Sequence, residues 1–214
     1  MSDPTGHDDQ DLIERAVSGD ESALAALFDG YRDRLRRMIR LRLDRRLSGR
    51  VDSSDVLQEA YLDVRKRMAE YARDPSSMPF HRWLRLVAGQ CLTDVHRHHL
   101  GAQMRDAGQE VSLHRGPFPQ ASSISLAAQL LGRMTSASQA AIRVEHKLIV
   151  QEALNSMDPI DREVLALRHF EHLSNDEAAQ VLGLSKSAAS NRYIRALKRL
   201  KEILSSIPGL REKL

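Results

Sequence analysis

Apolar side chains recur along this chain every three or four residues, and that spacing restricts the fold more than any other feature of the sequence. It is clearest between residues 80 and 95, where one helix face would carry Phe80, Trp83, Leu84, Val87, Ala88, Cys91, Leu92 and Val95. No segment shows the strict alternation of apolar and polar residues that is typical of a half-buried strand. The sequence therefore predicts an all-α fold.

The helical pattern is divided by a stretch of different composition. Similar apolar stripes run through residues 24–43 and 56–68, so we expect residues 9–100 to form one small helical domain. Between Gly101 and Ala140, Gly, Ala, Ser and Pro supply 19 of 40 positions and charged residues only 5. This composition indicates a long flexible linker over residues 101–143, with a weak helix around Leu126 to Met134. Residues 144–207 are expected to form a second helical domain.

The second domain contains the helix-capping and turn residues that are typical of a helix-turn-helix. Pro159 suits the first turn of a helix, and Ser174 with Glu177 forms a capping-box pattern before another. Gly183 is placed to end that short helix in the left-handed conformation, and Ser185 can cap a longer one. A short capped helix, a glycine and a longer capped helix are the helix-turn-helix arrangement.

The last helix is basic. It carries Lys186, Arg192, Arg195, Lys198, Arg199 and Lys201, with no acidic residue between Ser185 and Lys201. Such a run is often only a solvated face, but here it follows a helix-turn-helix pattern, and phosphates attract it without regard to sequence. Ser187, Ser190 and Asn191 add short polar groups where a major-groove helix meets base edges. Binding to duplex DNA is the favoured interpretation.

Several classes of protein are excluded. Cys91 is the single cysteine, so no internal disulfide or multi-cysteine zinc module forms, and a reducing cytosol is the expected compartment. The phosphate-binding glycine motifs are absent, which argues against a nucleotide-hydrolysing enzyme. The acidic N-terminus is no signal peptide, and the longest uncharged run, residues 116–132, contains Pro, Gln and Ser, so we expect no membrane insertion. His96 and His99 lack a third metal ligand, and we expect neither metal nor cofactor.

Particular residue strings identify a family. VDSSDVLQEAYL at residues 51–62 and FHRWL at 80–84 resemble region 2 of bacterial sigma factors. DREVL at residues 161–165, LGLS at 182–185 and RYIRA at 192–196 resemble region 4. The chain is thus similar to the extracytoplasmic-function (ECF) group of the sigma-70 family over about 160 of its 214 residues, in the expected order.

The resemblance implies a role for each matching set of residues. Docking on the clamp helices of the largest RNA polymerase subunit falls to Asp52, Asp55, Gln58 and Glu59, with Asp52 also a helix cap. Reading of the melted, single-stranded minus-ten element falls to Gln90, Asp94 and Arg97; Asn is usual in the family where Gln90 stands. Reading of the duplex minus-thirty-five element falls to Lys186, Ser187, Ser190, Asn191, Arg192, Arg195 and Lys198. Trp83 is expected in the core rather than stacked on a base.

The predicted function is that of a cytoplasmic initiation factor that is not itself an enzyme. Its implied partners are core RNA polymerase, including the flap of the second subunit, promoter DNA, and an anti-sigma factor. One alternative is a stand-alone helix-turn-helix regulator, which would bind duplex DNA without polymerase. Another is an enzyme that uses the histidine cluster or Cys91, but no third group arranges either into a nucleophile and base.

Overall fold

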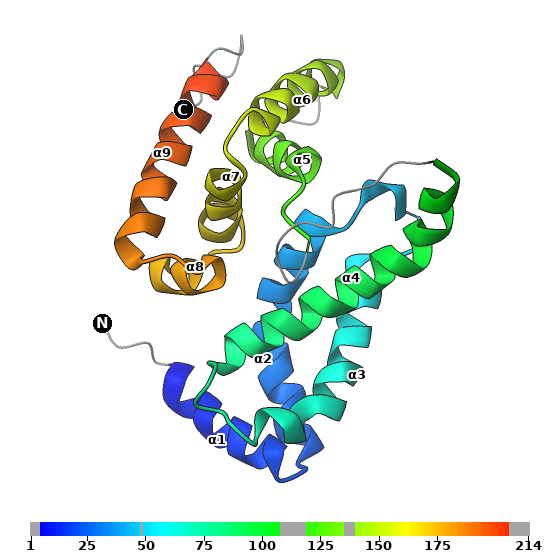
Figure 1. The fold of residues 1–214 in the computed structure, drawn as a ribbon, viewed down its shortest axis with the longest axis vertical. Coiled ribbons are helices and arrows are strands. Elements are labelled where there is room, and N and C mark those ends of the chain that lie inside the picture. Colours follow the sequence, from blue (N-terminus) through cyan, green and yellow to red (C-terminus); the bar gives the residue numbers. More distant parts are fainter. Residues whose placement is uncertain (1–4, 48, 108–118, 135–139, 206–214) are drawn as a thin grey trace. The chain divides into compact units, whose positions relative to one another are not determined.

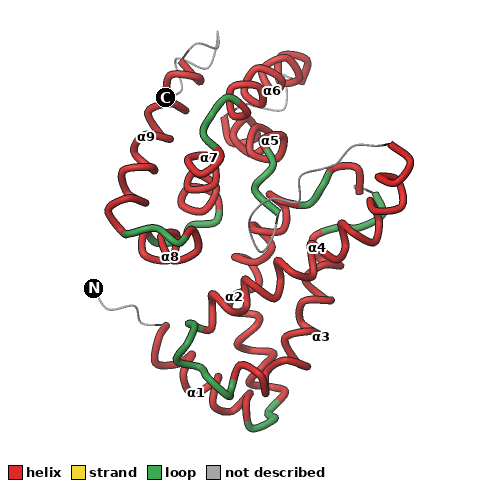
Figure 2. Tube along the Cα trace, in the orientation of Figure 1, coloured by secondary structure: helices red, strands yellow, loops and turns green. Residues whose placement is uncertain are grey.

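The computed structural model describes residues 5–47, 49–107, 119–134 and 140–205, and these contain helices and no strand. The elements are α1 (Thr5–Val17), α2 (Glu21–Arg42), α3 (Ser53–Tyr71), α4 (Phe80–Ala107), α5 (Ser123–Met134), α6 (Ala140–Asn155), α7 (Pro159–Leu165), α8 (Asn175–Leu182) and α9 (Lys186–Ser205), with a short 3-10 turn at Arg45–Leu47 and a π-helical turn at Ala166–Phe170 (Figures 1 and 2). The all-α prediction is confirmed. None of the described helices is long and apolar enough to cross a membrane.

The chain divides into two compact units. Unit 1 comprises Met1–Ile39 and Leu43–Pro119, and unit 2 comprises Arg40–Arg42 and Gln120–Leu214. Each unit is built around its own cluster of buried apolar side chains. The two units are described separately below.

Unit 1 is a helical bundle in which α3 packs against α4. Asp20 caps α2 by accepting hydrogen bonds from the backbone N–H groups of Ser22 and Ala23. At one end of the bundle the rings of Tyr71, Phe80 and Trp83 lie 4.9 to 5.7 Å apart, in the tilted and edge-on arrangements that aromatic pairs prefer. Trp83 is buried there, so its predicted place in the core is confirmed.

Unit 2 has a core to which α5 contributes a full apolar face. Leu126, Ala127, Leu130 and Leu131 are all buried in it, and α5 packs against α6. A helix was expected around Leu126 to Met134 as a weak element of a linker, whereas α5 begins at Ser123 and belongs to a core. Parts of the predicted linker, residues 108–118 and 135–139, lie outside the described residues, as does the end of the predicted second domain beyond residue 205.

The predicted helix caps and the glycine turn of the helix-turn-helix are confirmed in unit 2. Ser174 and Glu177 form a reciprocal capping box at the start of α8, and Gly183 ends α8 with a φ of 64°. The hydroxyl of Ser185 accepts a hydrogen bond from the Ala188 N–H, which begins α9. Asp158 caps α7 and Pro159 occupies its first turn. The turn before α8 contains a feature that the sequence did not predict, because His172 adopts a φ of 60°.

Candidate functional site

The face of α9 that points away from the unit 2 core carries most of the residues predicted to read duplex DNA. The opposite face of α9 is buried and carries Ala189, Ala196 and Leu200. Lys186, Ser187, Asn191, Arg195 and Lys198 are exposed, while Ser190 and Arg192 are half-buried. The structure therefore brings all seven predicted residues onto one helix, with a polar and basic surface along it.

Two of these residues are held by an acid that sequence reasoning did not identify. Asp161 of α7 accepts hydrogen bonds from Nε and Nη2 of Arg195 at 2.5 and 2.7 Å, and from Nη1 of Arg192 at 2.7 Å. The Asp161 side chain is only 7% exposed, whereas that of Arg195 is 61% exposed. The hydrogen bond from Arg195 is the main cause that lowers the pKa of the Asp161 carboxyl. The pair ties α7 to α9 and fixes where the two guanidinium groups point.

Further contacts join α9 to the elements before it. The Lys186 ammonium forms an ion pair with Asp176 of α8, and the Asn175 amide donates to the Lys186 carbonyl at 2.9 Å. The Arg168 guanidinium lies 5.1 Å from the centre of the Tyr193 ring, within the range of a cation–π interaction. α8 and the first half of α9 are thus held in a defined relative position, as a helix that reads DNA requires.

The polymerase-binding residues predicted on α3 fall into two pairs. Asp52 accepts from the N–H groups of Ser54 and Asp55, and the Asp55 carboxylate accepts from the Asp52 N–H at 2.8 Å, which completes a capping box. The cap expected of Asp52 is confirmed, and Asp55 shares it. Gln58 and Glu59 are exposed, and neither side chain has a partner in the part of the chain that the structure describes. These two are the groups left free for another molecule.

The three residues predicted to read the minus-ten element lie on one side of α4. Asp94 and Arg97 are exposed and form an ion pair at 3.5 Å. Gln90 is half-buried, and its side-chain oxygen accepts a 2.6 Å hydrogen bond from Arg67 of α3. Sequence reasoning missed Arg67, whose hydrogen bond occupies one lone pair of the Gln90 amide oxygen and orients that amide.

Cys91 and His96, which were considered for an enzymatic alternative, are buried or hydrogen-bonded within unit 1. Cys91 is buried, and burial followed by a hydrogen bond to Asp63 raises the pKa of its thiol to about 12. Such a thiol stays protonated at neutral pH and is a poor nucleophile. The Nε2 atom of His96 accepts a hydrogen bond from the Asp44 N–H at 3.2 Å. No group of three metal-binding side chains occurs among the residues that the structure describes.

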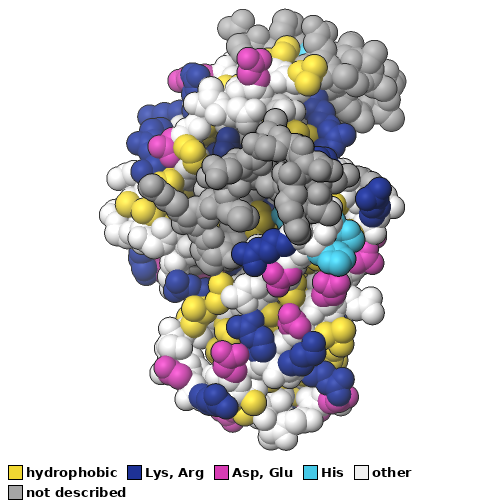
Figure 3. Space-filling model, turned by 45° about the vertical axis from the view of Figure 1, so that its right-hand side comes forward, with side chains coloured by type: hydrophobic (Ala, Val, Ile, Leu, Met, Phe, Trp, Pro, Cys, Tyr) yellow, Lys and Arg dark blue, Asp and Glu magenta, His cyan; other side chains and the backbone are white. Residues whose placement is uncertain are grey.

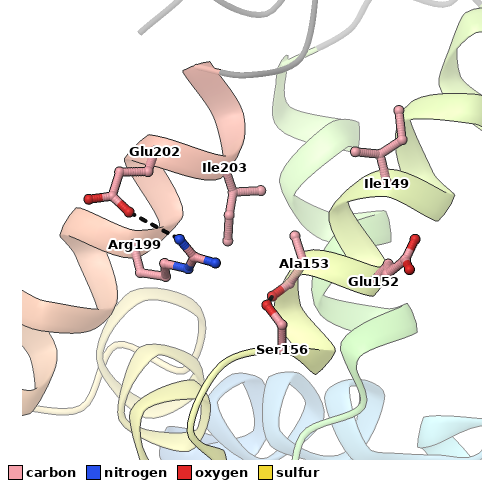
Figure 4. A pocket seen from close by; sticks show the side chains of 7 residues that line it. All are labelled: Ile149, Glu152, Ala153, Ser156, Arg199, Glu202 and Ile203. Carbon is pink, nitrogen blue, oxygen red and sulfur yellow. Dashed lines mark hydrogen bonds and ion pairs between the residues drawn. The ribbon is translucent and has the colours of Figure 1, made fainter.

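A groove opens within unit 2 between α6 and α9. It has a volume of about 410 Å³. Figure 4 shows Ile149 and Ala153 on α6 and Ile203 on α9 lining it, together with Glu152, Ser156, Arg199 and Glu202. Arg199 and Glu202 form an ion pair at 3.3 Å along its side. The groove thus offers an apolar strip with charged margins.

Acidic and basic side chains are mixed on the surface of unit 1. Residues 32–50 contain 9 Arg and 2 Asp, but Arg32 forms an ion pair with Asp29, and Arg36 forms one with Asp33. On α3, Arg65 forms an ion pair with Glu21 of the acidic N-terminal segment. Figure 3 shows Lys and Arg interspersed with Asp and Glu over the part of unit 1 that faces the viewer. The Arg-rich segment is therefore partly neutralised by nearby acids.

Known proteins resemble the chain in these same regions. The family described as "Sigma-70, region 4" matches residues 147–200, which include α7, α8 and most of α9. The RNA polymerase sigma-H factor of Pseudomonas aeruginosa is 24% identical over 97% of this chain and 98% of its own length. The ECF RNA polymerase sigma factor SigD of Mycobacterium tuberculosis is 27% identical over 89% of this chain and 81% of its own length. The ECF RNA polymerase sigma factor BldN of Streptomyces coelicolor is 24% identical over 91% of this chain, which spans 65% of BldN.

A solved structure shares the fold. CnrH, whose structure was solved in complex with the cytosolic domain of CnrY, superposes with a TM-score of 0.55 and 22% identity, covering 93% of this chain and 98% of that one. The region 4 match falls on the helix-turn-helix, and the sigma-H and SigD similarities extend through both units. The chain is thus similar to ECF sigma factors over most of its length and carries a sigma-70 region 4 match over residues 147–200.

Proposed function

We propose that this protein binds core RNA polymerase and directs it to promoters, with unit 2 reading the duplex minus-thirty-five element through α9. The observation that carries this function is the exposed polar and basic face of α9 on a capped helix-turn-helix. Such a face attracts phosphates and places short polar side chains at base edges. In this assignment residues 144–207 form the upstream-element domain, with Lys186, Ser187, Ser190, Asn191, Arg192, Arg195 and Lys198 at the DNA.

Polymerase binding is assigned to α3 of unit 1. Its exposed Gln58 and Glu59, beside Asp52 and Asp55, offer an acidic surface to the clamp helices of the largest subunit. α4 is assigned to the melted minus-ten element through Gln90, Asp94 and Arg97. Residues 9–100 are in this view the core-binding and melting domain, and the polymerase supplies all the chemistry, so the chain itself is not an enzyme.

The groove between α6 and α9 is a second candidate surface for the polymerase. Ile149 and Ala153 supply an apolar strip, and Leu148 beside them is exposed. We assign this groove to the flap of the second polymerase subunit. A protein with these partners acts in the cytoplasm. CnrH, which shares this fold, binds the cytosolic domain of another protein, CnrY, and the resemblance to ECF sigma factors implies an anti-sigma factor, so we also propose that such a factor binds this chain.

Reconstitution with a bacterial core polymerase tests the function. The holoenzyme is expected to enrich promoters from a genomic library and to initiate transcripts at them, whereas the free chain binds the same fragments weakly. A stand-alone regulator would instead bind duplex sites tightly without polymerase. Failure to bind core or to start any transcript, under conditions in which a known sigma factor works, would contradict the proposal.

A further inference from the structure

Ile194 stands out on α9 because it is apolar and half exposed. Its side chain is 49% exposed, although burial of an isoleucine stabilises a fold by roughly 1.5 to 3 kcal/mol. Ala196 and Leu200, which supply the buried face of α9, lie on the other side of the helix. Single exposed apolar residues are common on protein surfaces, so the position of Ile194 decides its meaning.

The neighbours of Ile194 on the helix surface are the proposed DNA-reading residues. Ser190 and Asn191 lie one turn before it, Ser187 two turns before it and Lys198 one turn after it, at the spacings that share a helix face. The guanidinium groups of Arg192 and Arg195 donate hydrogen bonds to Asp161 of α7 and are held toward that helix. Ile194 is therefore the apolar centre of a polar and basic face.

In the major groove of DNA, an apolar side chain of this kind finds one apolar group on the base edges. Base edges there present hydrogen-bond donors and acceptors, and the C5-methyl group of thymine is the apolar exception. We propose that Ile194 packs against a thymine methyl in the upstream promoter element and makes the chain prefer thymine at that position. This inference rests on the proposed function, because it requires α9 to lie in the major groove of duplex DNA. Lys198, which is exposed, supplies positive charge that brings the phosphates to this face.

The methyl group is tested by removing it from the DNA. The upstream element is first selected with the reconstituted holoenzyme from a randomised duplex library. Each thymine in it is then replaced singly by deoxyuridine, which lacks only the methyl group. One such replacement is expected to weaken holoenzyme binding about three- to fourfold, the loss of one buried methyl-sized contact. With Ile194→Ala, thymine and deoxyuridine at that position should bind equally.

The control is Ile160→Ala on α7, which removes another exposed isoleucine outside the α9 face and should keep the deoxyuridine effect. Ile194 is exposed and alanine favours helices, so Ile194→Ala is expected to fold, which circular dichroism of the full chain checks. If an element is enriched but no thymine responds, or Ile194→Ala keeps the same discrimination, the Ile194 contact is wrong while the sigma function stands. If no upstream element is enriched at all, the proposed function fails as well.

Discussion

Asp161 on α7 holds Arg195 on α9 through two hydrogen bonds, from Nε at 2.5 Å and from Nη2 at 2.7 Å. The carboxylate is almost buried, and the guanidinium keeps its remaining N–H groups toward solvent. Arg195 thus anchors α9 to α7, and its guanidinium is held in a fixed position at the surface. An arginine fixed in this way loses less side-chain entropy on binding DNA than a free lysine does.

Asp161→Asn should loosen the joint between α7 and α9. The amide cannot accept three charge-assisted hydrogen bonds, and we expect a loss of about 1 to 2 kcal/mol, a value discounted because Arg195 is 61% exposed and screened by water. Hydrogen exchange of α7 and α9 amides in the full chain measures it. Glu202→Gln is the matched control, because its ion pair with Arg199 is exposed on both sides and should contribute less than about 0.5 kcal/mol. Equal exchange in the two variants would contradict a structural role for Asp161.

The same pair makes the stability of unit 2 depend on pH. The pKa of Asp161 is lowered in the folded chain, so its contribution is complete above the unfolded pKa of about 3.9 and is lost as the pH falls through the folded value. The protection of α9 amides in the wild-type chain should therefore decrease below about pH 4. Asp161→Asn should show a smaller decrease over that range.

Lys198 offers a cleaner test of phosphate contact than Arg195 does. Its side chain is exposed and forms no ion pair in the described part of the chain, so all of its charge is available to DNA. For the full chain on a random-sequence 30-base-pair duplex, Lys198→Ala should reduce the slope of log affinity against log salt by about 0.9. Lys66→Ala on α3 removes an equal charge elsewhere and should leave the slope unchanged. An unchanged slope for Lys198→Ala would exclude a phosphate contact.

Arg195→Ala should also give a shallower slope and weaker upstream-element binding.

Local features of the fold were predictable because their determinants lie within a few residues. The Ser174–Glu177 capping box, the Gly183 turn and the Pro159 start each depend on one or two side chains acting on the adjacent backbone. The Asp161–Arg195 pair was not predictable in this way. Its members are 34 residues apart, and only the packing of α7 on α9 selects this acid among the many in the chain.

The interpretation of α5 shows the same limit. Its apolar residues have helical spacing, but the surrounding Ser, Ala and Gly gave the segment the average composition of a linker. Its place in the core of unit 2 depends on α6, which covers the apolar face. Likewise, the position of Gln90 on α4 followed from the motif, whereas its hydrogen bond to Arg67 requires the packing of α3 against α4.

Gly183→Ala should destabilise the turn between α8 and α9 by backbone strain alone. An added Cβ would meet no atom within 4 Å, so the cost comes from the φ of 64° and should be about 1 kcal/mol. Gly30→Ala is the matched control, since Gly30 lies within α2 with equal space around it but with an ordinary helical φ. There the same substitution should stabilise by about 0.5 to 1 kcal/mol. Hydrogen exchange in each helix measures both, and effects of the same sign would contradict this account.

His96 makes unit 1 sensitive to mild acid. Its Nε2 accepts the Asp44 N–H, and burial lowers the pKa of the imidazole, opposed by Asp44 and assisted by Arg46. Because the folded pKa lies below the unfolded value of about 6.5, the chain loses stability as the pH falls below that value. Unfolding of unit 1, followed by Trp83 fluorescence, should become easier between about pH 6.5 and 5. His96→Gln keeps an acceptor that does not titrate and should flatten this dependence, whereas the exposed His98→Gln should leave it unchanged.

Gln58 and Glu59, rather than the capping pair, provide the decisive test of polymerase binding. Asp55→Arg would remove a side chain that caps α3, at a cost of about 1 kcal/mol, so weaker binding by that variant would also report a damaged helix. Gln58→Ala with Glu59→Arg changes two exposed groups that have no partner in the described chain, and should weaken core binding at least tenfold without altering the unfolding of unit 1. Asp11→Arg reverses an exposed acid on α1 and serves as the control for net charge. Fluorescence anisotropy of the labelled chain with core polymerase measures both; equal affinities would place the polymerase contact elsewhere.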